Sequence, residues 1–256
     1  MEFEEIIFEG LRNTYFEHQE LQFSFFDENI FNITEYLITV NICKSIHLWN
    51  KKNKYPYKIE LEKKTFDFFR NCFDNHKRDG ETIFSPTIFS IHEKGFKENI
   101  EKIRKGRLDI ALSKNETNYK GSSEYIFEIK SINPQPSLLL KDFERIKRFL
   151  NTEIKGFKNY FKAGYLIFFI HHNNFKKIET KKELSDKKEQ RLKRIKDKLE
   201  EICPNNISLK IQTDNIVHYG VEQLRLENGF DYNEESYKTL IFSSVIIKIE
   251  TIANTV

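Results

Sequence analysis

One apolar run, AGYLIFFIHH at residues 163–172, constrains the fold more than any other segment of the chain. The run is shorter than the ~18 consecutive apolar residues that would indicate a membrane span. An apolar run of this length predicts a strand buried on both faces, as in sheets that carry helices on both sides. The chain is therefore predicted to contain a sheet between two layers of helices.

Two shorter segments, GRLDIAL at residues 106–112 and YIFEIK ending at Lys130, alternate apolar and polar residues. Successive side chains of a strand point to opposite faces, so Glu128 and Lys130 share one face of the second strand. If the strands pair through the polar loop 113–123, Asp109 lies beside that pair. The alternation predicts two carboxylates and an ammonium at one edge of a sheet.

This combination of side chains suits the hydrolysis of a phosphodiester bond. Mg²⁺ is commonly held by one or two carboxylates, with water and substrate phosphate completing its shell, and it lowers the pKa of bound water. A nearby lysine can orient that water or offset charge in the transition state. The backbone carbonyl of Ile129 would be a further oxygen ligand. The alternative interpretation is a surface salt bridge between neighbouring strands, because charged cross-strand pairs are common.

R-x-D-I on one strand, a loop, an apolar strand ending in E-I-K and then an amphipathic helix resemble the PD-(D/E)xK nucleases, the restriction-endonuclease-like superfamily. The resemblance covers about residues 32–172, and Leu108 stands where the family's name has proline. It implies that Asp109 and Glu128 are metal ligands and that Lys130 is the catalytic lysine.

The same resemblance implies a helix before the first core strand that carries a further glutamate. NITEYLITVNICKSI at residues 32–46 fits this expectation, with Thr34 or Asn32 as its cap. Glu35 in its first turn is an additional carboxylate for the metal site. Alternatively, Glu35 only stabilises the helix N-terminus through the dipole. YKIELEK at residues 57–63 then alternates as a half-buried strand.

A second helix is expected from Ser137, which can cap it, to about Leu150. Its apolar residues recur at helical spacing and predict a buried stripe. A separate basic stripe would follow nucleic-acid phosphates or be merely solvated. The stripe consists of Lys141, Arg145 and Arg148.

Positive charge is concentrated in one further segment. Between Lys176 and Lys198 there are eleven Lys or Arg against five Asp or Glu, which predicts a basic amphipathic helix over residues 181–202. The helix would be solvated, bind a partner, or contact nucleic-acid phosphates, and the predominance of lysine favours non-specific attraction. The residues expected to contact phosphates are Lys181, Lys188, Arg191 and Lys198.

No linker or repeat divides the 256 residues, so a single domain, 1–256, is expected. The nuclease-like core would occupy about residues 32–172. The basic helix and C-terminal strands would occupy residues 176–256, completing the sheet or forming an added layer. Three scattered cysteines and the acidic N-terminus indicate neither a disulfide framework nor a secretory signal. A cytoplasmic protein without a membrane span is therefore predicted.

Together these features predict an α/β fold, with a central mixed sheet flanked by helices and C-terminal additions. The expected function is a nuclease that uses Mg²⁺ or Mn²⁺ and acts on DNA, as in restriction or anti-phage defence, with a partner subunit or as a homodimer. The rival hypothesis is a non-catalytic nucleic-acid-binding or scaffold subunit that keeps a nuclease-like fold. A third is an unrelated α/β protein in which the trio is a salt bridge.

Overall fold

The computed structural model describes residues 3–25, 33–73, 106–115, 122–154, 158–174, 181–217 and 239–252. Helices and strands are interspersed along this length. In chain order the elements are α1 (Phe3–Phe25), α2 (Glu35–Lys52), β1 (Tyr57–Lys64), α3 (Thr65–Asn71), β2 (Arg107–Lys114), β3 (Ser123–Ile132), α5 (Pro136–Asn151), β4 (Ala163–Asn174), α6 (Lys181–Glu200), β5 (Ile207–Val217) and β6 (Thr239–Thr251).

The six strands form one mixed sheet in the order β1-β2-β3-β4-β6-β5. Strands β3 and β4 run parallel and are joined through α5, whereas the other neighbours are antiparallel. The predicted α/β fold with a central mixed sheet flanked by helices is confirmed. The C-terminal strands complete the sheet and do not form an added layer, because β6 pairs with both β4 and β5.

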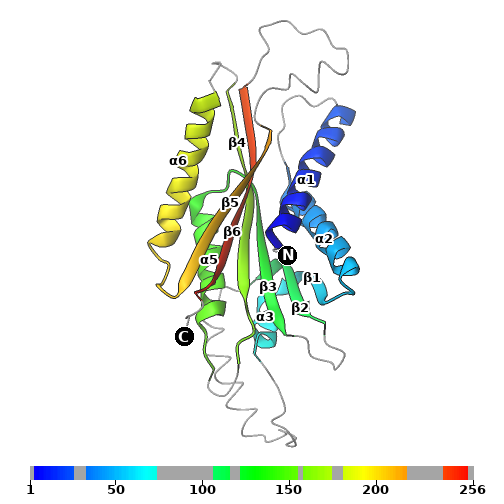
Figure 1. The fold of residues 1–256 in the computed structure, drawn as a ribbon, viewed down its shortest axis with the longest axis vertical. Coiled ribbons are helices and arrows are strands. Elements are labelled where there is room, and N and C mark those ends of the chain that lie inside the picture. The colour runs from blue at the N-terminus through cyan, green and yellow to red at the C-terminus, as the bar shows by residue number, and fades with distance from the viewer. Residues whose placement is uncertain are drawn as a thin grey trace, which may run out of the picture.

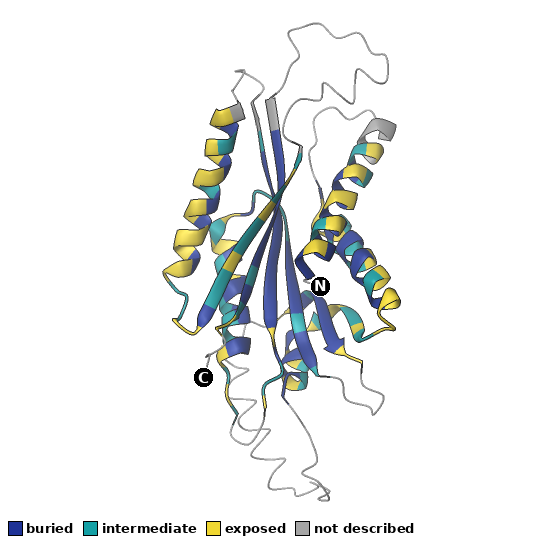
Figure 2. Cartoon of the chain, in the orientation of Figure 1, coloured by how far each residue is buried: buried dark blue, intermediate teal, exposed yellow. Residues whose placement is uncertain are grey.

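Helices cover both faces of the sheet, with α1 and α2 on one side and α5 and α6 on the other (Figure 1). Strand β4 is buried between these layers, as its apolar run predicts. Leu166 and Phe168 belong to the core cluster that α5 and α6 cover, and Ile167 and Phe169 belong to the cluster under α1 and α2. The strands at the centre are accordingly buried, whereas the outer side of α6 is exposed (Figure 2).

Helix α1 is an element that the sequence pattern did not predict. It buries Ile7, Leu11 and Tyr15 in the core. Its Gly10 faces the backbone of α2, since a Cβ there would lie 2.7 Å from Ile42 Cα. The absence of a side chain at this position lets the two helices approach closely. Helices α1 and α2 thus form a tight layer over one face of the sheet.

Gly164 of β4 gives α5 a similar close approach on the other face. A Cβ at this position would lie 2.6 Å from Ile146 Cγ2. We expect Gly164→Ala to lower the free energy of unfolding by roughly 1–3 kcal/mol, because overpacking forces side chains or backbone to move. Urea unfolding of Gly164→Ala, Ile146→Ala and the double variant measures this. The two changes should together cost less than the sum of their separate costs, and additive costs would contradict the contact.

Candidate functional site

Asp109 lies where β2 and β3 stop pairing with each other. In the described pairing, the last matched residues toward this end are Ile110 and Phe127. Beyond them the carboxylate of Asp109 takes the place of a backbone acceptor, and its Oδ2 accepts a hydrogen bond of 2.6 Å from the Ile129 amide. The hydrogen bond holds Asp109 beside the segment that carries Glu128 and Lys130.

Glu128 and Lys130 both point to the α5 side of β3, as their spacing predicts. Oε1 of the buried Glu128 lies 2.5 Å from Nη2 of Arg145. Nζ of Lys130 lies 3.1 Å from Oδ2 of Asp142 and donates a hydrogen bond of 2.9 Å to the Ile129 carbonyl. Glu128 and Lys130 are therefore each paired with a residue of α5.

Asp142 and Arg145 connect these two pairs. Nη2 of Arg145 also lies 3.0 Å from Oδ1 of Asp142, so Lys130, Asp142, Arg145 and Glu128 form a continuous chain of ion pairs. Nη1 of Arg145 donates a hydrogen bond of 3.2 Å to the carbonyl of Arg107 at the start of β2. Helix α5 is thus bound to both strands that carry the trio.

The structure does not place Arg145 where the sequence analysis expected it. Residues three and four apart share a helix face, so Arg145 lies on the buried face with Asp142 and Phe149, all facing the sheet. Of the predicted basic stripe, Lys141 is exposed and Arg148 is half-buried. The helix itself begins with Pro136 and has Gln135 as its N-cap, where the sequence analysis expected Ser137.

Asp142 is a site residue that the sequence analysis missed. Its side chain is buried within the apolar stripe of α5. The signal was present, because Asp142 is three residues after Leu139 and four before Ile146. A carboxylate inside such a stripe indicates a buried partner, since an unpaired buried charge is costly.

The electrostatics of the trio combine burial with the opposing effects of neighbouring charges. Burial raises the pKa of Asp109, while the hydrogen bond from Ile129 and the charge of Lys130 act in the lowering direction. Burial also raises the pKa of Glu128, well above its usual value, against the lowering effect of Arg145. Burial alone would lower the pKa of Lys130, but the carboxylates of Asp142 and Asp109 outweigh it and raise that pKa. Lys130 is therefore held as a cation.

Glu35 is the first residue of α2, which packs on the opposite face of the sheet from α5. Thr34 is the N-cap of this helix and accepts a hydrogen bond of 3.2 Å from the Leu37 amide, whereas Asn32 lies outside the described residues. The side chain of Glu35 is exposed, and its charge acts to raise the pKa of Asp109. Glu35 is thus within electrostatic reach of the trio.

The residues at this site fit a divalent cation in donor chemistry and in charge. The carboxylates of Asp109 and Glu128 and the carbonyl of Ile129 are hard oxygen donors. Glu128 Oε1 is buried and, among the described residues, has only the ion pair with Arg145 and no hydrogen bond. The interacting charged groups have a formal excess of two negative charges. They are the carboxylates of Glu35, Asp109, Glu128 and Asp142 and the cations of Lys130 and Arg145.

The protein side chains alone do not make a complete metal shell. In the part of the chain that the structure describes, no three His, Cys, Asp or Glu side chains are grouped so as to hold a metal ion. Two carboxylates and a carbonyl match the sparse protein ligation that Mg²⁺ accepts when water and substrate phosphate supply the other ligands. The fit is therefore to a cation shared with substrate.

The basic helix α6 is only partly open to solvent. Lys188 is buried, and its Nζ lies 3.1 Å from Oδ1 of Asn215 on β5. Lys188 lies between Leu184 and Leu192 in the buried stripe of the helix. This position differs from the exposed one that the predicted phosphate contact requires. Arg191 is half-buried and donates a hydrogen bond of 3.1 Å to a backbone carbonyl before α5. Lys198 is exposed, and the side chain of Lys181 lies outside the described part of the structure.

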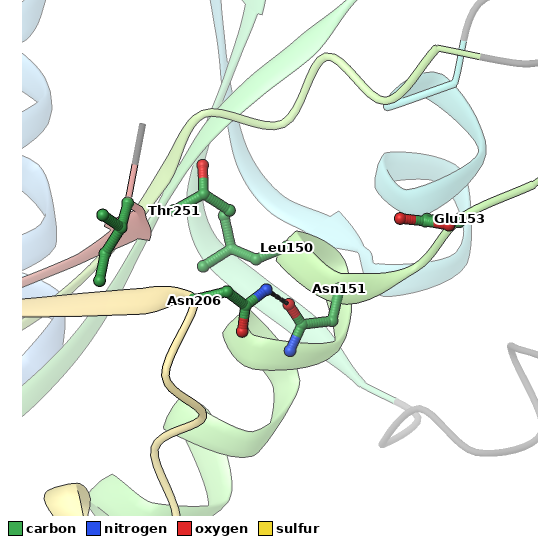
Figure 3. Close-up of a pocket in the computed structure, with 6 residues that line it drawn as sticks. Leu150, Asn151, Glu153, Asn206 and Thr251 are labelled. Carbon is green, nitrogen blue, oxygen red and sulfur yellow. Dashed lines mark hydrogen bonds between the residues drawn. The ribbon is translucent and has the colours of Figure 1, made fainter. Parts of the chain in front are cut away.

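A pocket of about 380 Å³ lies at the C-terminal end of α5 (Figure 3). Nδ2 of Asn206 donates a hydrogen bond of 2.8 Å to Oδ1 of Asn151 across it. The residues that line it are Leu150, Asn151, Glu153, Asn206, Thr251 and Ile252. None of these side chains belongs to the trio or to its ion pairs.

Among the helices in the described ranges, none combines the length and the apolar character that crossing a membrane requires. No protein-family model, no curated protein and no solved structure matches the chain.

Proposed function

We propose that the protein is a metal-dependent nuclease that hydrolyses phosphodiester bonds in DNA. The observation that carries the proposal is the convergence of Asp109, Glu128 and Lys130 at the point where β2 and β3 stop pairing. Two carboxylates with raised pKa values beside a lysine held as a cation are suited to a divalent ion and a phosphate.

Each residue has a separate role in this proposal. Asp109, Glu128 and the Ile129 carbonyl would hold Mg²⁺ or Mn²⁺, which when bound lowers the pKa of a water and neutralises phosphate charge. Lys130 positions the attacking water and stabilises charge that develops on the phosphoryl oxygens. Glu35 adds negative charge near Asp109.

Exposed basic residues of α5 and α6 would supply the attraction for a nucleic-acid backbone. Lys141 follows the first turn of α5, and Lys198 lies in the last turn of α6. Lysine side chains favour phosphate contact without base reading, so binding would be weakly specific and sensitive to salt. A role in restriction or anti-phage defence, in the cytoplasm and with a partner subunit or as a homodimer, is proposed by analogy with the superfamily that the site motif resembles.

One observation favours a second candidate, a non-catalytic nucleic-acid-binding or scaffold subunit. Glu128 is paired with Arg145 and Lys130 with Asp142, so these charges are already compensated within the protein. A buried network of this kind would also be kept if it only fixed α5 on the sheet. The two candidates differ in whether the site turns over substrate.

The decisive experiment incubates the purified protein with plasmid, linear duplex and single-stranded DNA. We expect cleavage with Mg²⁺ or Mn²⁺, none with a chelator, and recovery when the metal is added back. A Lys130→Gln preparation made in parallel controls for contaminating nucleases. DNA binding without cleavage under every metal condition would favour the scaffold function, and neither binding nor cleavage would contradict both candidates.

A further inference from the structure

Asp142 contacts the candidate lysine of the trio, although neither the sequence motif nor the proposed metal site includes it. Its side chain is fully buried, and its two oxygens reach different cations. Oδ2 lies 3.1 Å from Lys130, and Oδ1 lies 3.0 Å from Arg145. We infer that Asp142 is a positioning residue that fixes the Lys130 ammonium at the site. The effect on catalysis rests on the proposed nuclease function.

Two contacts together define the place of the Lys130 ammonium. A lysine has a flexible stem of four carbons and three donors without fixed directions, so one contact does not fix its position. Here the ammonium is held between Asp142 Oδ2 and the carbonyl of Ile129, the residue that directly precedes Lys130. Because Ile129 also donates its amide to Asp109, the ammonium is fixed relative to Asp109.

Arg145 fixes the position of Asp142 in turn. The guanidinium is planar and its donors lie in fixed directions. It contacts Asp142 Oδ1, Glu128 Oε1 and the Arg107 carbonyl, so it relates α5 to both β2 and β3. The carboxylate of Asp142 is therefore placed by a rigid partner, and the flexible Lys130 is placed by Asp142.

A purely structural role for Asp142 predicts different results. In that case Asp142 would only anchor α5, and its loss would disturb the site in the same way whether or not Lys130 were present. A positioning role requires that the effect of removing Asp142 pass through Lys130. Nuclear magnetic resonance of the lysine ammonium and a double-mutant cycle distinguish these two roles.

The first measurement uses the metal-free protein and does not depend on cleavage. The ¹⁵N signal of the Lys130 ammonium, identified by its loss in Lys130→Gln, should shift or broaden in Asp142→Asn. The matched control is Glu144→Gln on the same helix, because Glu144 pairs with Lys147 at 2.6 Å. That change should move the Lys147 signal and leave the Lys130 signal in place. An unchanged Lys130 signal in Asp142→Asn would overturn the inference.

The second measurement is the kinetic cycle. Asp142→Asn should lower kcat by roughly 10- to 100-fold with little change in KM, and it should add no further loss in a Lys130→Gln background. Equal losses in both backgrounds would overturn the positioning role. Asp142→Glu keeps the charge if Asp142→Asn fails to fold, and it should give a displaced Lys130 signal and an intermediate kcat. If wild-type protein cleaves nothing but the Lys130 signal responds, the contact stands and the nuclease proposal fails.

Discussion

Asp109→Asn and Lys130→Gln are each expected to lower kcat for DNA cleavage by roughly 100-fold or more. The first removes an anionic oxygen donor, and the second removes a charge that acts on the phosphoryl group, so both act on the barrier. Single-turnover cleavage with saturating metal measures the effect. DNA binding in Ca²⁺ should be retained by the Lys130→Gln variant.

Matched controls separate this effect from a general loss of charge. Asp214→Asn removes a carboxylate that pairs with Arg12 at 2.7 Å, and Lys58→Gln removes an exposed lysine on β1. Both should cleave as the wild type does. Because burial raises the pKa of Asp109, the neutral amide should not lower the stability of the metal-free protein. Full activity in both site variants would refute the assignment of the trio.

Arg145→Met is expected to lower the free energy of unfolding by roughly 3–5 kcal/mol at neutral pH. The variant leaves Glu128 buried without its cation, and breaking one side of a buried ion pair is strongly destabilising. Adding Glu128→Gln removes the uncompensated charge, so the double variant should recover much of the loss. Urea unfolding of the wild type, Arg145→Met and the double variant measures these free energies. A double variant no more stable than Arg145→Met alone would contradict the interaction between Glu128 and Arg145.

The cost of Arg145→Met should also depend on pH, through Glu128. Burial raises the pKa of Glu128 above its usual value of 4.5, so the folded state binds a proton more readily than the unfolded state. Stability from such a group is complete below the usual pKa and is lost as the pH rises through the raised one. The cost of Arg145→Met should therefore be smaller at pH 5 than at pH 7.5. An equal cost at both pH values would exclude Glu128 as the cause.

Local patterns predicted the strands of the site because the alternation of side chains is a local property. The shared face of Glu128 and Lys130 follows from their spacing on β3. Their partners on α5 do not, because the crossing of a helix over a sheet is set by tertiary packing. For this reason Arg145 was assigned to a basic stripe separate from the buried one, whereas it lies on the buried face of α5. Lys188 was misplaced similarly, although its spacing from Leu184 and Leu192 marks the buried stripe of α6.

Other parts of the fold were beyond local patterns for different reasons. Helix α1 does carry a local pattern, since the buried Phe3, Ile7, Leu11 and Tyr15 recur every four residues, but its close packing on α2 at Gly10 does not follow from that pattern. The position of β6 between β4 and β5 depends on long-range pairing, which residue periodicity does not encode. The mixed sheet could be predicted as a class, whereas the order of its C-terminal strands could not.

The place of β6 in the sheet has a consequence for how the chain folds. Strand β6 is the last described strand to leave the ribosome, yet it pairs along the whole length of β4, from Ala163 to Asn174. Until it arrives, β4 presents an apolar strand with an unpaired edge, which is a site for aggregation. Because β4 also supports β3, a nascent chain would acquire a rigid β3 only once synthesis has passed about residue 251. Release of a shortened chain would therefore leave Glu128 and Lys130 on a strand whose neighbour is incompletely paired.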